Sequence, residues 1–231
     1  MNLLRRFRRR VCEHVGIDKY SYPALNKIDK KLLKYLEHKN GFFVEAGANN
    51  GYRQSNTYYL ERFRGWHGIL IEGIPELYRQ CVHERPNSKV YNYGLVSSEY
   101  KDDNIRMNYA DLMSVVDGAF DSPTAAEAHY KKGVEIQKIE NHYEINVCAR
   151  TLSSVLDEYG LTEPIDLLSL DVEGYEVEVL KGIDFNRHCP KYILVEARNI
   201  EAIEELLTRH YRLIDQFSHH DYLFMNNNSE L

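Results

Sequence analysis

Four apolar runs in this sequence each end in a carboxylate side chain, and this pattern has the clearest chemical meaning. Short apolar runs are typical of buried strands, and the acids that close them are Glu45, Glu72, Asp171 and Glu196. Ligands of open α/β sheets bind outside the carboxyl ends of the strands. We therefore expect the four acids to share one rim, which would suit a cationic ligand, sugar hydroxyls or a divalent metal.

The first of these acids lies in a turn that lets a ligand approach the backbone. Residues 42–51 read F-F-V-E-A-G-A-N-N-G, and glycine has no Cβ to obstruct a ligand. A dinucleotide fingerprint needs G-x-G-x-x-G, but Gly47 and Gly51 are spaced G-x-x-x-G, and Glu45 would repel phosphate. S-adenosylmethionine carries an ammonium and a sulfonium and no phosphate, so it suits this turn better. The alternative is a strand-to-helix turn that uses glycine only for its geometry.

The second acid has the spacing of a ribose ligand. Glu72 follows Gly51 by 21 positions. In Rossmann-like units an acidic residue about 20 positions beyond the glycine turn accepts hydrogen bonds from ribose hydroxyls. A simple charge at a strand end is the alternative interpretation.

Composition restricts the class of protein. The chain has 231 residues and a net charge of -6, which allows one α/β domain with a substantial core and argues against a nucleic-acid binder. No apolar run approaches the roughly 20 residues of a membrane span, and no apolar segment typical of a secretory signal follows the N-terminal arginines. The four cysteines are scattered, which suits a reducing, cytoplasmic location.

Strand patterns alternate with helix patterns along the chain, which predicts a mostly parallel sheet covered by helices on both faces. The strands expected are residues 42–45, 69–72, 88–96, 165–170, 192–195, 211–217 and 222–225, the last two forming a hairpin, and residues 143–149 could add one more. We expect an N-terminal helical extension over residues 1–39 and a domain over residues 40–231. An irregular insertion at about 98–142 would lie where loops often cover an active site.

Residues 1–16 predict a basic amphipathic helix. Its apolar stripe comprises Leu3, Leu4, Phe7 and Val11, and five arginines accompany it. The interpretation we favour is that the stripe packs on the domain while the arginines stay solvated. The alternative is weak contact with an anionic membrane surface or a partner.

Several motifs together resemble the FkbM family of S-adenosylmethionine-dependent methyltransferases. The most specific is D-V-E-G-Y-E-V-E-V-L-K-G at residues 171–182. It is accompanied by F-V-E-A-G-A-N-N-G at 43–51, I-E-G at 71–73, T-L-S-S-V-L at 151–156 and Y-I-L-V-E at 192–196. The resemblance covers roughly residues 40–225. It implies a Rossmann-like class I methyltransferase fold, with a seven-stranded sheet whose last strand is antiparallel, and O-methylation of a sugar, glycan or secondary metabolite.

The resemblance also implies roles for individual residues. Around the methionine part of the donor it places Glu45, Ala46, Gly47, Asn49 and Gly51. Glu72 with Gly73 would hold the ribose, Tyr93 with Gly94 would lie near the adenine, and Asp171 and Glu173 would lie beside the methyl group. Glu45 stands where the family commonly has Asp, and residues 98–142 match no acceptor site.

Methyl transfer requires that the acceptor oxygen, the methyl carbon and the sulfur be aligned. A hydroxyl is a weak nucleophile, so a base or a metal should assist it. Asp171 is the first candidate for the base, with Glu173 as its catalytic neighbour. Asp171, Glu173 and Glu196 could instead hold Mg²⁺ or a similar divalent metal. Alternative bases are His67, His129, His142, His219 and His220.

Two rival functions share parts of this pattern. An NAD-dependent sugar oxidoreductase or epimerase would share the sheet and the ribose acid, but it should carry the third glycine and a Tyr-x-x-x-Lys pair. A non-catalytic Rossmann-like binding protein could use the arginine-rich N-terminus for docking. Partners expected are a small-molecule or glycan acceptor and no nucleic acid. The oligomeric state stays open.

Overall fold

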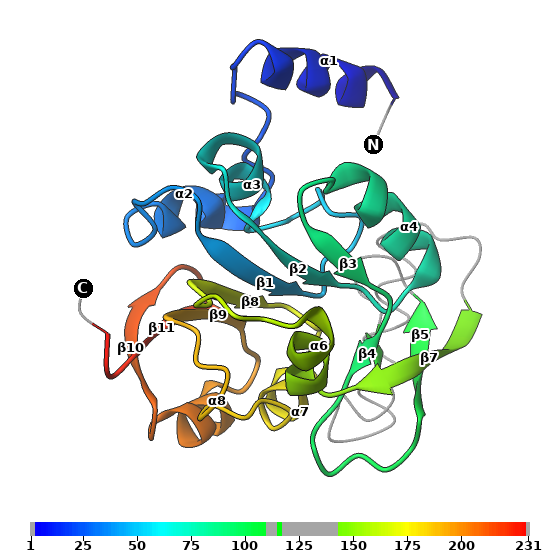
Figure 1. Cartoon of the computed structure of the whole chain (residues 1–231), viewed down its shortest axis with the longest axis vertical. Helices are drawn as coiled ribbons and strands as arrows, with labels where there is room; N and C mark the ends of the chain where they lie inside the picture. Colours follow the sequence, from blue (N-terminus) through cyan, green and yellow to red (C-terminus); the bar gives the residue numbers. More distant parts are fainter. Residues whose placement is uncertain (1–2, 110–114, 117–142, 230–231) are drawn as a thin grey trace.

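A seven-stranded sheet forms the centre of the molecule (Figure 1). The computed structural model describes residues 3–109, 115–116 and 143–229. The strand order is β10-β11-β9-β8-β1-β2-β3. The strands are β1 (Phe42–Ala46), β2 (His67–Ile71), β3 (Lys89–Tyr91), β8 (Leu167–Leu170), β9 (Tyr192–Glu196), β10 (Tyr211–Gln216) and β11 (Asp221–Asn226).

The pairing of these strands confirms the predicted fold class. β1, β2, β3, β8 and β9 pair in parallel. The last strand, β11, is antiparallel to both β9 and β10. The chain therefore has the mostly parallel sheet and the antiparallel C-terminal strand expected of a Rossmann-like α/β fold.

Helices cover both faces of the sheet because alternate residues of a strand point to opposite faces. Phe42, Val44 and Ala46 of β1 join the core cluster that contains residues of α6, α7 and α8. Phe43 joins the other cluster, with residues of α2, α3 and α4. The helices are α2 (Ile28–Leu32), α3 (Tyr58–Arg64), α4 (Pro75–Glu84), α6 (Leu152–Tyr159), α7 (Glu176–Leu180) and α8 (Ile200–Leu207), with a 3-10 helix, η1 (Leu25–Lys27), before α2.

The expected third strand, residues 88–96, is wrong as a single strand. It divides into β3 in the main sheet and β4 (Gly94–Leu95) in a second sheet. Between them, the Asn92 side-chain amide donates 2.7 Å hydrogen bonds to the carbonyl oxygens of Glu72 and Gly73. Asn92 thus ties the departing chain to the end of β2.

The second sheet has the order β4-β7-β5-β6, in which β4 and β7 flank the expected insertion and β5 and β6 lie within it. Its other strands are β5 (Asn104–Tyr109), β6 (Val115–Val116) and β7 (Tyr143–Arg150). The strand expected at 143–149 is therefore confirmed, but it belongs to this sheet. Most of the expected insertion lies outside the described residues.

The N-terminal helix α1 (Leu3–His14) forms as predicted. The expectation that its apolar stripe packs on the domain is wrong, whereas Arg5, Arg8 and Arg10 are exposed as expected. The stripe is exposed: 83% for Leu3, 72% for Leu4, 68% for Phe7 and 48% for Val11. Arg9, by contrast, is 1% exposed. In Figure 1, α1 lies beyond α3 and α4, at the edge of the molecule.

Within the described part of the chain, none of the helices is both long and apolar enough to cross a bilayer.

Candidate functional site

One cavity opens at the carboxyl ends of β1, β2 and β8. It contains about 910 Å³ of space not filled by atoms, part of it open to solvent. Most of the predicted site residues line it, namely Glu45, Ala46, Gly47, Asn49, Glu72, Gly73, Tyr93, Gly94, Asp171 and Glu173. The structure therefore brings side chains from four separate chain segments into one place, as expected of the rim of a parallel sheet.

Gly47 lets β1 and β8 approach each other at the floor of this cavity. Its φ is +82°, and a Cβ built there would lie 1.7 Å from the backbone oxygen of Asp171. The Gly47 and Ala48 amides both donate to the carbonyl oxygen of Ile71, at 3.0 and 3.1 Å. A side chain at position 47 would therefore displace the ends of two strands.

Glu72 ties the end of β2 to two neighbouring turns. Its Oε2 accepts a 2.7 Å hydrogen bond from the Asn49 amide, and its Oε1 accepts one of 2.7 Å from the Ile74 amide. The side chain is 7% exposed and lines the cavity. Backbone donors thus fix both carboxylate oxygens in the place where the sequence predicts the ribose.

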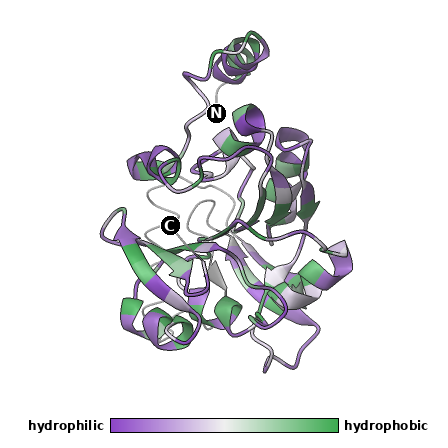
Figure 2. Cartoon of the chain, turned by 60° about the vertical axis from the view of Figure 1, so that its left-hand side comes forward, coloured by the Kyte–Doolittle hydropathy of each residue, from purple (hydrophilic) through white to green (hydrophobic). Residues whose placement is uncertain are grey.

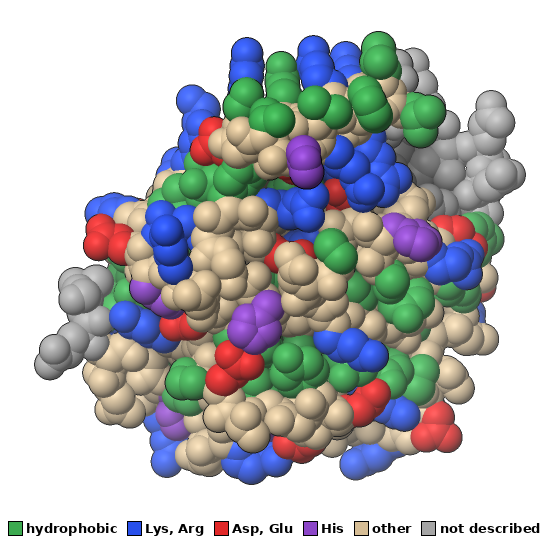
Figure 3. Space-filling model, turned by 45° about the horizontal axis from the view of Figure 1, so that its top comes forward, with side chains coloured by type: hydrophobic (Ala, Val, Ile, Leu, Met, Phe, Trp, Pro, Cys, Tyr) green, Lys and Arg blue, Asp and Glu red, His purple; other side chains and the backbone are tan. Residues whose placement is uncertain are grey.

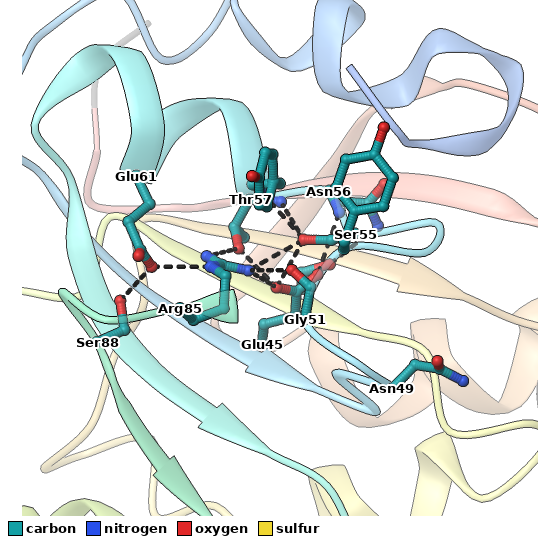
Figure 4. A network of polar contacts seen from close by, with 12 residues as sticks. Glu45, Asn49, Gly51, Ser55, Asn56, Thr57, Glu61, Arg85 and Ser88 are labelled. Carbon is teal, nitrogen blue, oxygen red and sulfur yellow. Dashed lines mark hydrogen bonds and ion pairs between the residues drawn. The ribbon is translucent and has the colours of Figure 1, made fainter. Parts of the chain in front are cut away.

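Glu45 is engaged by a buried polar network rather than presenting an isolated negative charge (Figure 4). Its oxygens accept hydrogen bonds from the Thr57 hydroxyl at 2.6 Å, the Ser55 hydroxyl at 3.0 Å and the Asn56 amide at 3.1 Å. The Arg85 guanidinium forms an ion pair with Glu45 at 3.1 Å. A cation therefore already neutralises the carboxylate that we expected to attract the ligand.

Arg85 is the residue that our sequence reasoning missed. The residue is fully buried, and besides Glu45 it binds Glu61 at 2.8 Å and the Gly51 carbonyl oxygen at 3.3 Å. Removing one partner of a buried ion pair typically costs about 3–5 kcal/mol, so this network fixes the turn that forms the cavity wall. A lone arginine at the end of a helix carries no sequence signal for such a role.

Gly51 belongs to this network rather than to the cavity. A Cβ at this position would lie 2.8 Å from the Arg85 side chain and 3.0 Å from the Cys81 sulfur. The glycine is needed because Arg85 and Cys81 fill the space beside it.

Asp171 and Glu196 form a coupled pair of acids beside the cavity, joined by a side-chain hydrogen bond. Burial, with the charges of Glu196, Glu173 and Glu176, raises the pKa of Asp171 well above its usual range. Burial also raises the pKa of Glu196, against the opposing effect of its hydrogen bond with Asp171. Two acids so close cannot both ionise readily, so the site disfavours a second negative charge on this pair.

Glu173 has an ion-pair partner of its own. It adopts a φ of +56°, and its carboxylate lies 2.8 Å from the Arg198 guanidinium. Ion pairs with Arg85 and Arg198 therefore compensate Glu45 and Glu173 in part. The negative charges of Glu173, Glu176 and Glu196 still act together on Asp171.

The metal site expected at Asp171, Glu173 and Glu196 is not found. Among the residues that the structure describes, no three His, Cys, Asp or Glu side chains are grouped so that they could hold a metal ion.

None of the described histidines lines the cavity. His67 lies 3.1 Å from Glu163, and His219 and His220 are exposed in the turn between β10 and β11. His129 and His142 lie outside the described residues. Among the described candidates, Asp171 and its neighbour Glu173 line the cavity, and the described histidines do not.

The strand order, the antiparallel final strand and a cavity at the carboxyl ends of the strands define a Rossmann-like class I methyltransferase fold. A family model, the Methyltransferase FkbM domain, matches residues 45–224. The chain belongs to this family of S-adenosylmethionine-dependent methyltransferases, and this assignment replaces the NAD-dependent alternative.

The individual proteins that this chain resembles share low sequence identity with it. A protein named Methyltransferase sdnD, from Sordaria araneosa, is 28% identical over 202 residues, which cover 74% of this chain and 76% of that protein. A methyltransferase from Pyrococcus furiosus is 13% identical with a TM-score of 0.42, covering 95% of this chain and 94% of that chain. A human methyltransferase 10 domain containing protein is 11% identical with a TM-score of 0.46, covering 88% and 83%.

The cavity suits the parts of S-adenosylmethionine. Apolar side chains of the kind that contact an adenine are among its lining residues, namely Ile71, Leu77, Leu95, Met107 and Val179. Glu72 offers carboxylate acceptors for ribose hydroxyls, and the Cβ-free surface of Gly47 leaves room for close approach. The residues present therefore fit the donor that the family uses.

Proposed function

We propose that this protein transfers a methyl group from S-adenosylmethionine to a hydroxyl of a sugar, a glycan or a secondary metabolite. The observation that carries the proposal is that Asp171 lines the cavity and is hydrogen-bonded to the Glu196 side chain. A hydroxyl keeps its proton at neutral pH, so its methylation gains from a nearby base. A carboxylate pair with raised pKa values is suited to accept that proton.

In this mechanism the chain's own residues orient the donor and receive a proton. Gly47 and the network around Arg85 fix the cavity wall, and Glu72 holds the ribose hydroxyls. The bound donor supplies an activated methyl group on a sulfonium, which is a good leaving group. As the methyl group would pass from sulfur to the acceptor oxygen, Asp171 would accept the proton of the hydroxyl, with Glu196 as its hydrogen-bonded neighbour. Much of the rate comes from alignment, because proximity alone can lower a barrier by several kcal/mol.

Donor binding is tested by calorimetric titration with S-adenosylmethionine, S-adenosylhomocysteine and NAD⁺. We expect the first two to bind and NAD⁺ not to bind. Glu72→Gln should weaken donor binding at least about tenfold because it removes the charge that receives the ribose hydroxyls. Glu163→Gln changes the same chemistry at an acid outside the cavity and should leave affinity unchanged. Equal affinities in both variants would refute the role of Glu72.

Transfer is tested with radiolabelled donor and a panel of sugar nucleotides, glycans and phenolic metabolites. With an accepted substrate, Asp171→Asn should lower turnover by about a hundredfold or more, the usual contribution of a general base. Its amide can still donate to Glu196, so donor affinity should change little. Full turnover in this variant would remove Asp171 from the chemistry. Donor binding without transfer to any panel member would favour the non-catalytic binding protein.

A further inference from the structure

The N-terminal helix α1 is held to the body of the protein by its polar face. The buried Arg9 forms an ion pair with Glu84 of α4, and its guanidinium lies 3.5 Å from the centre of the Tyr52 ring. Arg6 lies 3.1 Å from Glu84. On the same side of the helix, Glu13 lies 3.1 Å from Arg62 of α3. Helices α3 and α4 thus fix which face of α1 points inward.

The opposite face of α1 is apolar and points outward. At about 100° per residue, Leu3, Leu4, Phe7 and Val11 fall within an arc of roughly 120° centred opposite Arg9. All four are exposed, and Val15 and Ile17 just beyond the helix are 62% and 49% exposed. Figure 3 shows apolar side chains gathered over this end of the molecule with Lys and Arg side chains beside them. Figure 2 shows α1 as a separate rod with a hydrophobic and a hydrophilic side.

Positive charge borders this apolar stripe on both sides. On a helical projection, Arg8 and Arg10 fall on its two margins. The Arg10 side chain is 46% exposed, and it also lies 3.6 Å from Glu84. The one acidic residue of α1, Glu13, points to the body, where it accepts a 2.9 Å hydrogen bond from Tyr58. Residues 1–16 contain five arginines and one acid, a net charge of about +4 in a chain whose net charge is -6.

We propose that α1 docks the protein on an anionic lipid surface, lying in the plane of the membrane interface. Side chains such as Leu3, Leu4 and Phe7 would enter the boundary between headgroups and acyl chains, which lies about 5–10 Å deep. The flanking arginines would meet the negative headgroups, which attract basic side chains near the membrane surface. The helix has 12 residues, so it is about 18 Å long and lies on a bilayer rather than crossing it.

The positive charge beside the stripe favours an anionic lipid surface over a second copy of the chain as its partner. Pairing two copies of α1 through their apolar stripes would bring the arginine margins of both helices together, and like charges at close range repel. An anionic lipid surface covers the same stripe and compensates the same arginines. This docking needs neither a bound donor nor turnover, so it can fail or succeed independently of the proposed methyl transfer.

The experiment is vesicle co-sedimentation of the full chain. Vesicles of phosphatidylcholine alone are compared with vesicles in which about a third of the lipid is phosphatidylserine. We expect binding to the anionic vesicles only, and a loss of most of it when salt is raised to about 0.5 M, which shortens the screening length. Absence of binding to anionic vesicles at low salt would overturn the proposal.

Two substitutions test whether vesicle binding depends on the stripe of α1 or on any exposed apolar residue. Phe7→Glu should lower the vesicle partition coefficient at least about tenfold because it places a negative charge in the stripe. Leu213→Glu makes a similar change at an exposed residue of β10 and should bind vesicles like the unaltered protein. Circular dichroism and donor titration check that both variants stay folded. If Phe7→Glu still binds vesicles fully, or if it only converts a dimer to a monomer, the proposal is wrong.

Discussion

At the scale of single residues, Gly47 decides whether the donor cavity can form. Its neighbour across the turn is backbone, the carbonyl oxygen of Asp171, which cannot move aside as a flexible side chain could. The same residue forms a hydrogen bond with the end of β2. Position 47 therefore joins three strands, and no residue larger than glycine satisfies this geometry.

We predict that Gly47→Ala lowers donor affinity at least about tenfold and destabilises the fold by about 2–4 kcal/mol. Part of the cost is the left-handed backbone, and the larger part is the overlap with Asp171. Calorimetric donor titration and urea denaturation measure the two effects.

Gly160→Ala is the matched control for that change. Gly160 has a similar φ of +72°, but nothing lies within 4 Å of a Cβ built there. We expect a cost of about 1 kcal/mol and unchanged donor affinity. If the two variants behave alike, the overlap with Asp171 does not control the cavity.

At the scale of elements, the turn between β8 and α7 is stabilised by a buried acid. The Glu176 carboxylate accepts hydrogen bonds from the Gly174 amide at 2.9 Å and the Val172 amide at 3.2 Å. Burial nonetheless raises the pKa of Glu176 to about 6, against the opposing effect of those amides. The start of α7 is therefore held by an acid whose ionisation the fold disfavours.

We predict that this group makes stability fall as pH rises from about 4.5 to about 6. The folded protein binds the proton more tightly than the unfolded chain, so the stabilisation is complete below the unfolded pKa and lost above the folded one. A shift from 4.5 to about 6 corresponds to about 2 kcal/mol. Glu176→Gln should remove that pH-dependent part, measured as the difference in unfolding free energy from the unaltered protein at each pH. A difference that does not vary with pH would contradict this.

At the scale of the whole molecule, consecutive residues at the end of α4 serve two different regions. Glu84 pairs with Arg6, Arg9 and Arg10 of α1. Arg85, the next residue, binds the network behind the donor cavity. The residue that holds α1 and the residue that supports the cavity wall are therefore adjacent in the chain at the end of α4.

We predict that Glu84→Gln loosens α1 without unfolding the main sheet. The change removes the charge that compensates the buried Arg9, and a buried cation without its partner is costly. Amide hydrogen exchange in α1 should become at least about tenfold faster, with β1 and β8 unchanged. Glu178→Gln, which affects an exposed pair with Lys181, serves as the control. Equal exchange in α1 of both variants would show that Glu84 does not hold the helix.

Local sequence patterns were enough to predict most strands along the chain, the glycine turn and the identity of most cavity residues. These follow from local patterns: apolar runs, turn residues and acids at strand ends, whose meeting at one rim is a property of any parallel sheet. The ion-pair partners of the buried charged side chains became known only from the tertiary structure. Arg85 is 40 positions from Glu45, and Glu84 is 75 positions from Arg9, so no spacing signals either pair. The outward face of α1 was decided in the same way, because ion pairs with α3 and α4 hold its polar face toward the body.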